Sequence, residues 1–209
     1  MPATLEQDHS LVISGASWAL YWQLREDIDD RRQIVYDGER IEVMPTPISY
    51  EHDETKTLLA RLVELYAALE DVPLRGIGSV TLAGELINRG CESDEAYYVG
   101  DAESQPPANI GLFDPAIHQP PDLVIEIDVT SRSVSKDPVY AALGVVEVWR
   151  WRDGDLMVYH LTDGRYELRD DSDLLSDLSM HDLADHVRLG RRLSQPDVVR
   201  AWRKHLGHG

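Results

Sequence analysis

Residues 121–131, PDLVIEIDVTS, form a hydrophobic run that carries an acid at regular intervals. In an extended strand, successive side chains point to opposite faces of the sheet. Asp122, Glu126 and Asp128 therefore share one face of the expected strand with a valine, while the other face is entirely aliphatic. Because burial of an unpaired carboxylate costs on the order of several kcal/mol, water, a cationic group or a metal ion must offset these charges.

The segments around this run predict an α/β domain. Helical periodicity is clearest over residues 49–70 and is also present over 16–28, and Asp37-Gly38 between two β-rich runs predicts an N-terminal β-hairpin. Short strands are expected around residues 74–83 and over 92–100, and a β-meander follows residue 145. Since the most apolar strand lies in the middle of the chain, we expect it at the centre of a sheet that helices flank on both faces.

Length and charge distribution suggest one domain with a C-terminal extension. We expect an N-terminal tail over residues 1–15, a single domain over 16–168, and an acidic linker followed by a basic helix, packed on the domain, over 169–209. Residues 167–185 carry seven acids and one arginine, whereas residues 186–209 carry six Lys or Arg and one acid. Both runs can equally be solvated surface.

Composition excludes several classes of protein. Thirty-eight acids against twenty Lys and Arg give a formal charge of −18, which argues against a broad nucleic-acid-binding surface. The single cysteine, Cys91, excludes an internal disulfide framework and a cysteine-based zinc site. No apolar run reaches the ~20 residues that cross a bilayer, and the first ten residues lack the features of a secretory signal. We therefore expect a cytoplasmic protein with no membrane association.

Acids and one lysine carry the candidate chemistry. The sequence contains no Gly-rich phosphate loop before a helix, no His-Glu-x-x-His and no Gly-x-Ser-x-Gly. Asp94 and Glu126, on adjacent strands, could lie about 5 Å apart and hold one Mg²⁺ or Mn²⁺ between them. Lys136 could orient the attacking water and neutralise charge on a phosphodiester. This combination predicts a hydrolase of phosphate esters.

At these residues the sequence resembles the Uma-type restriction endonuclease family, a branch of the PD-(D/E)xK nuclease superfamily. The resemblance rests on Asp94, on PDLVIEID with Glu126, on KDPVYAALGVVEVW with Lys136, and on RQIVYDGERIEVMPTPISYEHD with His52. It spans roughly residues 16 to 168 and implies a restriction-endonuclease-like fold with a mixed central sheet. It also implies a metal-dependent endonuclease that acts on DNA, with Asp94, Glu126 and Lys136 as catalytic residues and Asp94 and Glu126 as metal ligands.

The sequence departs from the superfamily pattern at two positions. Ser93 stands where the motif has proline, and Asp128 stands where it has lysine, so only the displaced Lys136 can supply the positive charge. The literal Pro-Asp pair at 121–122 lies too close to Glu126 to act as the motif. Asp122, Asp128 and His52 are candidate pocket residues.

Structural alternatives accompany several of the candidates. Asp94 could cap a turn, Lys136 could be an exposed residue at a helix start, and His52 could be a packing histidine. Asp128 could equally support the site without binding the metal directly or form the turn that follows the strand. At the level of the whole chain, the alternatives are a catalytically inactive nuclease-like scaffold that binds nucleic acid or protein, and a hydrolase of small phosphodiesters.

Cleavage of both DNA strands would require two sites, which makes a homodimer plausible. The C-terminal basic residues could hold phosphates or form a solvated helix end: Arg191, Arg192, Arg200, Arg203 and Lys204.

Overall fold

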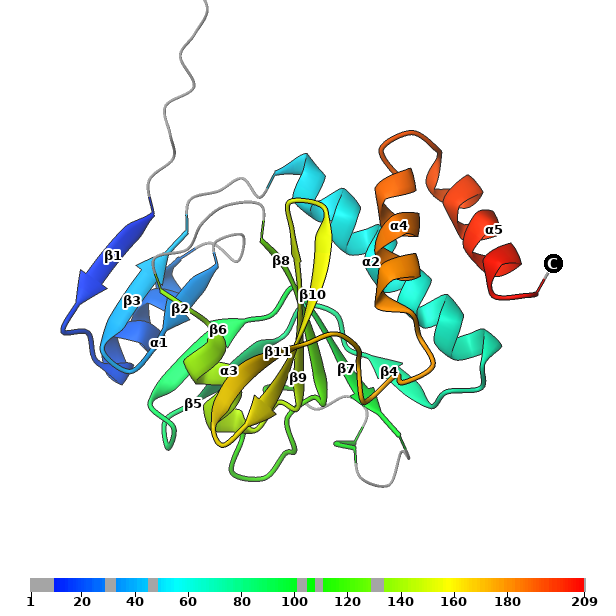
Figure 1. Cartoon of the computed structure of the whole chain (residues 1–209). Helices are drawn as coiled ribbons and strands as arrows, with labels where there is room; N and C mark the ends of the chain where they lie inside the picture. The colour runs from blue at the N-terminus through cyan, green and yellow to red at the C-terminus, as the bar shows by residue number, and fades with distance from the viewer. Residues whose placement is uncertain are drawn as a thin grey trace, which may run out of the picture.

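The computed structural model describes residues 10–28, 33–44, 49–100, 105–107, 111–128 and 134–208. Most of the expected N-terminal tail, the prolines at 45 and 47, and part of the polar turn expected after residue 129 lie outside the described residues. Within the described part of the chain, eleven strands form two sheets, and five helices cover them (Figure 1).

The larger sheet contains the strand that carries the acids. Strand β8 (Leu123–Asp128) pairs in parallel with β9 and antiparallel with β7, so the sheet is mixed. The other neighbouring strands pair antiparallel, and β9 to β11 form the predicted meander. The order of the strands is β11-β10-β9-β8-β7-β4. Their bounds are β4 Leu74–Gly76, β7 Glu95–Val99, β9 Glu147–Arg152, β10 Asp155–Thr162 and β11 Arg165–Arg169.

The smaller sheet contains the predicted hairpin and three further strands. Its order is β1-β3-β2-β6-β5, with every pair antiparallel. Gly38 adopts a φ of 102° in the hairpin turn, a backbone conformation that favours glycine. Neither β1 nor β6 is predicted from the sequence. The bounds are β1 Leu11–Ser14, β2 Ile34–Tyr36, β3 Arg40–Val43, β5 Thr81–Gly84 and β6 Arg89–Glu92.

Helices and the smaller sheet cover opposite faces of the larger sheet. Ile125 and Ile127 pack with residues of α2, α4 and α5, whereas Val124 packs on the other face with α3 and the smaller sheet. This division confirms the predicted alternation along β8. Helix α1 packs on the smaller sheet. The helices are α1 Trp18–Asp27, α2 Tyr50–Leu69, α3 Asp137–Leu143, α4 Met180–Leu189 and α5 Gln195–His205.

The C-terminal segment contains one more helix than expected. The acidic segment predicted as a linker includes the start of α4, whose buried side chains Leu183, Ala184 and Val187 face the core. Trp202 of α5 is buried, and its indole N–H donates to the Leu62 carbonyl at 3.0 Å, which anchors α5 on α2. Among the described helices, none combines the length and hydrophobicity that crossing a bilayer requires.

Candidate active site

The pairing of β7 with β8 places Asp94 beside Glu126. In this antiparallel pair Glu95 lies opposite Ile125 and Ala96 opposite Val124. The same register puts Asp94, one residue before β7, opposite Glu126 in the middle of β8. Both side chains are buried, since each residue is 1% exposed. The two acids thus come from neighbouring strands, as the sequence analysis expected.

Asp94 is held by three donors from different parts of the chain. Its Oδ2 accepts a hydrogen bond from the backbone N–H of Ile127 at 2.9 Å and lies 3.1 Å from His52 Nε2. Its Oδ1 accepts a hydrogen bond from Gln33 Nε2 at 2.8 Å. Burial raises the pKa of Asp94, but the charge of Lys136 and the contacts with His52 and Ile127 outweigh it and lower the pKa well below its usual range. Asp94 is therefore an ionised carboxylate at neutral pH.

His52 reaches Asp94 from the first turn of α2. Ser49 caps the helix, and its hydroxyl accepts a hydrogen bond from the His52 backbone N–H at 3.2 Å. This cap fixes the start of the helix next to β8. Burial lowers the pKa of His52, but the hydrogen bond and charge of Asp94, with a smaller contribution from Asp53, raise it above its ordinary value overall. His52 thus joins the cluster as a partner of Asp94.

Lys136 and Tyr140 hold the other carboxylate from α3. Lys136 directly precedes the helix, and its ammonium lies 2.6 Å from Glu126 Oε2. Tyr140, one turn further on, donates its hydroxyl proton to Glu126 Oε1. Lys136 is only 2% exposed. Burial raises the pKa of the Tyr140 phenol, and the nearby Cys91 and Glu126 raise it further, so Tyr140 remains a proton donor in this hydrogen bond.

Asp128 pairs with arginines at the end of β8. Arg152 Nη2 lies 2.9 Å from Asp128 Oδ2, and Arg150 Nη1 lies 3.6 Å from the same oxygen. Arg150 is the register neighbour of Glu126 on β9 and also forms an ion pair with Asp137. These two arginines therefore offset the charge of Asp128 beside the cluster.

Asp122 lies apart from the other candidates. Its Oδ2 accepts a hydrogen bond from the Val99 backbone N–H at 2.8 Å, beyond the opposite end of β8. Asp122 and Glu126 are four positions apart along the extended chain, which corresponds to about 13 Å. The structure brings together Asp94, Glu126, Lys136 and His52 and does not bring Asp122 to them.

Several residues around the cluster were not assigned a role from the sequence. Gln33 precedes β2 of the smaller sheet and bonds Asp94, while Glu42 of β3 is fully buried and accepts a hydrogen bond from the Val134 backbone N–H at 2.8 Å. Arg150 had a visible signal, because it is a charged residue between two tryptophans of one strand. Glu42 had a similar signal, because it stands between two aliphatic residues of one strand. Gln33 had none, since its contact with Asp94 depends on how the two sheets pack.

The donor set is suited to a hard divalent cation. Asp94 and Glu126 offer carboxylate oxygens from adjacent strands, and the lowered pKa of Asp94 keeps it in the ionised form that binds metal. Oxygen ligands of this type fit Mg²⁺ or Mn²⁺. The structure brings two acids on paired strands of a mixed sheet and one lysine at the start of α3 into one cluster, which is the arrangement that the resemblance to restriction-endonuclease-like nucleases implies.

Comparison with known proteins specifies the family. The model of the Uma2 family, described as "Putative restriction endonuclease", matches residues 18–193. The chain belongs to this family, and the matched region continues past residue 168 through α4. No curated protein matches the chain.

A solved structure shares the fold. The crystal structure of a protein from Anabaena variabilis ATCC 29413, described as a putative nuclease belonging to DUF820, aligns with a TM-score of 0.54 at 15% sequence identity. The alignment covers 82% of this chain and 99% of that chain. The predicted fold class and the recognised family are confirmed.

Proposed function

We propose that this protein is a metal-dependent endonuclease that hydrolyses phosphodiester bonds of DNA. The observation that supports this most strongly is the meeting of Asp94, Glu126 and Lys136 in one buried cluster, with the two acids on paired strands. Membership of a family described as "Putative restriction endonuclease" is consistent with it.

Each residue of the cluster has a defined role in this proposal. Asp94 and Glu126 would hold Mg²⁺ or Mn²⁺, which when bound polarises a phosphoryl oxygen and lowers the pKa of bound water. Lys136 would orient the attacking water and neutralise charge that develops on the phosphate. His52 and Tyr140 act through hydrogen bonds that fix the two carboxylates and are positioning residues.

Plasmid cleavage tests the proposal. With Mn²⁺ or Mg²⁺, the wild type should convert supercoiled plasmid to nicked or linear DNA, and Glu126→Ala and Lys136→Ala should each lose roughly 100-fold or more of that rate. Glu167→Ala removes an exposed acid on β11 and should cleave as the wild type does. Absence of metal-dependent cleavage by the wild type on single-stranded, duplex and branched DNA would contradict the proposal.

A second candidate is a catalytically inactive nuclease-like scaffold. The contacts of Glu126 favour it, because Lys136 and Tyr140 already offset this buried charge with protein groups alone. A metal titration followed by thermal unfolding separates the two candidates. An active site predicts a rise in Tm with Mg²⁺ or Mn²⁺ that Glu126→Ala abolishes, whereas a scaffold predicts no rise in either protein.

Two finer points of the proposal can be tested separately. Turnover of a generic phosphodiester without cleavage of any DNA would favour a hydrolase of small substrates.

Cleavage of both strands of a duplex would require two sites, so we propose a homodimer as the cutting form. Sedimentation of the wild type with and without duplex DNA should then show a species of twice the monomer mass.

A further inference from the structure

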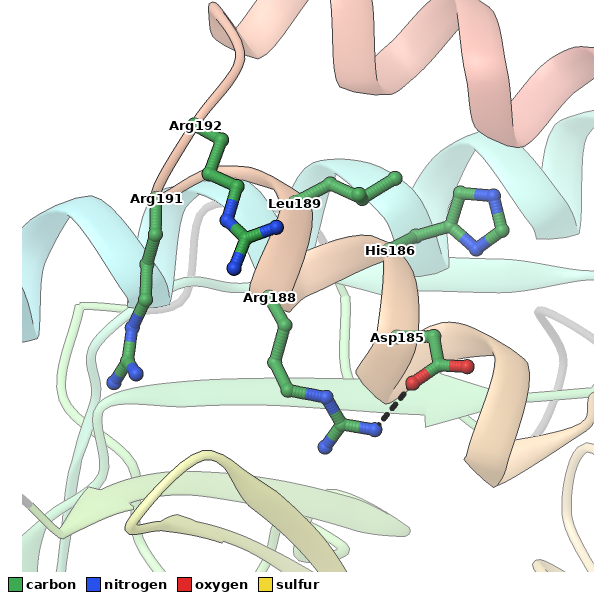
Figure 2. A pocket seen from close by; sticks show the side chains of 6 residues that line it. All are labelled: Asp185, His186, Arg188, Leu189, Arg191 and Arg192. Carbon is green, nitrogen blue, oxygen red and sulfur yellow. Dashed lines mark hydrogen bonds and ion pairs between the residues drawn. The ribbon is translucent and has the colours of Figure 1, made fainter.

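Three arginines lie at the end of α4 and in the turn that leads to α5. Arg188 lies in the last turn of α4, and Arg191 and Arg192 follow within the turn; we call these three residues the arginine ledge. They line a hollow of about 510 Å³ together with Asp185, His186 and Leu189. Figure 2 shows that all three arginine side chains extend from the end of the helix toward the same side.

The arginine ledge lies next to the element that carries His52. Arg191 Nη2 lies 3.3 Å from Glu51 Oε1, and Glu51 directly precedes His52 on α2. A second hollow, of about 260 Å³, is lined by Glu51 and Thr55 of α2, by Trp151 of β9 and by residues of the ledge. The ledge therefore borders the first turns of α2.

The ledge also contacts the hairpin that joins β9 to β10. Arg188 Nη1 donates to the Gly154 carbonyl at 2.6 Å in the turn of this hairpin. The start of α2, the tip of the hairpin and the α4–α5 turn all lie at the upper side of the molecule in Figure 1, as does the carboxyl end of β8. An extended ligand that binds at the cluster of Asp94, Glu126 and Lys136 can thus also reach the arginine ledge.

The arginines of the ledge differ in how firmly the protein holds them. Arg188 is bound to Gly154 and Asp185, which makes it part of the local structure. The Arg191 side chain is 63% exposed, and among the described residues its one ion-pair partner is the exposed Glu51. Arg192 is exposed, and no acid among the described residues forms an ion pair with it. Two guanidinium groups are therefore available to a ligand.

Other basic residues of the C-terminal segment lie in different surroundings. Arg200 forms an ion pair with Asp197 on its own helix. Arg203 and Lys204 lie in the last turn of α5, close to His208, which contacts Glu70 beyond the carboxyl end of α2. They are therefore at the end of α2 that is remote from His52, although they carry the same charge as Arg191 and Arg192.

We propose that the arginine ledge binds backbone phosphates of DNA next to the bond that is cleaved, through Arg191 and Arg192. This inference rests on the proposed function, because it assigns the surface that holds the substrate of that site. The planar guanidinium group binds phosphate oxygens in a bidentate manner, and contacts with phosphates position a duplex without reading its sequence. In a chain with a formal charge of −18, a local basic surface is needed to hold a polyanion.

Glu51 competes with the substrate for Arg191 in this arrangement. A phosphate that binds Arg191 must displace the Glu51 carboxylate, whose negative charge also repels DNA. Glu51→Gln should therefore bind DNA more tightly than the wild type. Partial unfolding of the variant cannot produce such a gain.

Salt-dependent binding tests the ledge. Fluorescence anisotropy with a labelled DNA duplex, in Ca²⁺ or without metal, compares the wild type with Arg191→Ala/Arg192→Ala and with the matched control Arg203→Ala/Lys204→Ala. Loss of two phosphate contacts should reduce the slope of log K against log salt by about two and weaken binding roughly 10- to 100-fold at ~0.1 M salt. The control should stay within about twofold of the wild type, because it keeps both contacts.

The outcomes separate the ledge from the proposed function. Suppose that the wild type binds and nicks DNA, and that the ledge variant has the same affinity and salt slope as the wild type and the control. The proposal that the ledge binds phosphates is then wrong, and the nuclease proposal stands. If the wild type neither binds nor nicks DNA, both are wrong. Equal melting temperatures of the two double variants would exclude unfolding as the cause of weaker binding, and Arg191→Gln/Arg192→Gln provides a second variant if alanine destabilises the turn.

Discussion

Lys136 and Glu126 form an ion pair of 2.6 Å in which both side chains are only 2% exposed. The lysine precedes α3 and the glutamate lies in the middle of β8, so the pair joins one helix to the central sheet. Removal of one partner of such a buried pair leaves the other charge without compensation. The pair therefore couples the stability of the fold to the residues of the site.

Substitution of Lys136 by methionine should lower the free energy of unfolding by about 3 kcal/mol or more, because Glu126 then remains buried without its cation. Urea denaturation of the metal-free protein measures this loss. The double variant Lys136→Met/Glu126→Gln should be more stable than Lys136→Met alone, since it removes both charges. Additive losses in the double variant would contradict a direct coupling between the two groups.

The stability of the metal-free protein should depend on the protonation of His52. Its pKa is raised in the fold, so its contribution is fully present below the ordinary histidine pKa and is lost as pH rises through the raised value. Urea denaturation from about pH 6 to about pH 9 should therefore show a fall in stability that His52→Gln lacks. An NMR titration should show that Asp94→Asn lowers the pKa of His52, because that variant removes the carboxylate charge. An unchanged pKa in that variant would disprove the coupling.

Glu147 should contribute strongly to stability away from the site. It is fully buried, and it accepts hydrogen bonds from the Trp149 indole, the Ser172 hydroxyl and the backbone N–H groups of Asp173 and Leu174. Glu147→Ala should lower the free energy of unfolding by about 3 kcal/mol, because these donors lose their acceptor. Glu167→Ala, at an exposed position, should change it by less than about 0.5 kcal/mol. Similar losses in the two variants, measured by urea denaturation, would show that Glu147 has no such role.

Gly90 of β6 allows the Tyr21 ring to pack against the backbone. A Cβ atom at this position would lie 2.5 Å from Tyr21 Oη and 2.6 Å from its Cζ, and Tyr21 is fully buried. Gly90→Ala should therefore lower the melting temperature, with a destabilisation of about 2 kcal/mol. Gly111→Ala is the matched control, because its added Cβ would have no atom of the described residues within 4 Å apart from its chain neighbours. Equal melting temperatures of the two variants would show that the ring can move aside.

The elements predicted from the sequence are those with strong local patterns. The alternation along PDLVIEID predicts β8, and the stripe that includes Leu58, Leu59 and Leu62 predicts α2. Strand β6 has the sequence RGCE, which shows no alternation of apolar and polar residues. It is a strand because it pairs with β5 and β2. Helix α4 was missed because its exposed acids obscured a short apolar stripe.

The acids of the site were easier to predict than their partners. Asp94 and Glu126 lie on consecutive strands of one sheet, and such strands often pair, so their proximity follows from local information. Gln33 directly precedes β2 of the smaller sheet, far from Asp94 in the sequence, and only tertiary packing brings the two together. The arginine ledge depends likewise on how α4 packs against α2.

The chain crosses from the smaller sheet to the larger one within two residues, Ser93 and Asp94. Ser93 donates its backbone N–H to Val80 at 3.0 Å, and the Asp94 carbonyl accepts from the Ser79 hydroxyl at 3.0 Å. A peptide inserted at this crossover would displace one carboxylate relative to the other, whereas an insertion between β7 and β8 leaves their register free to form. Variants with a peptide inserted between β7 and β8 should therefore retain a site that variants with the same peptide inserted at the crossover lose.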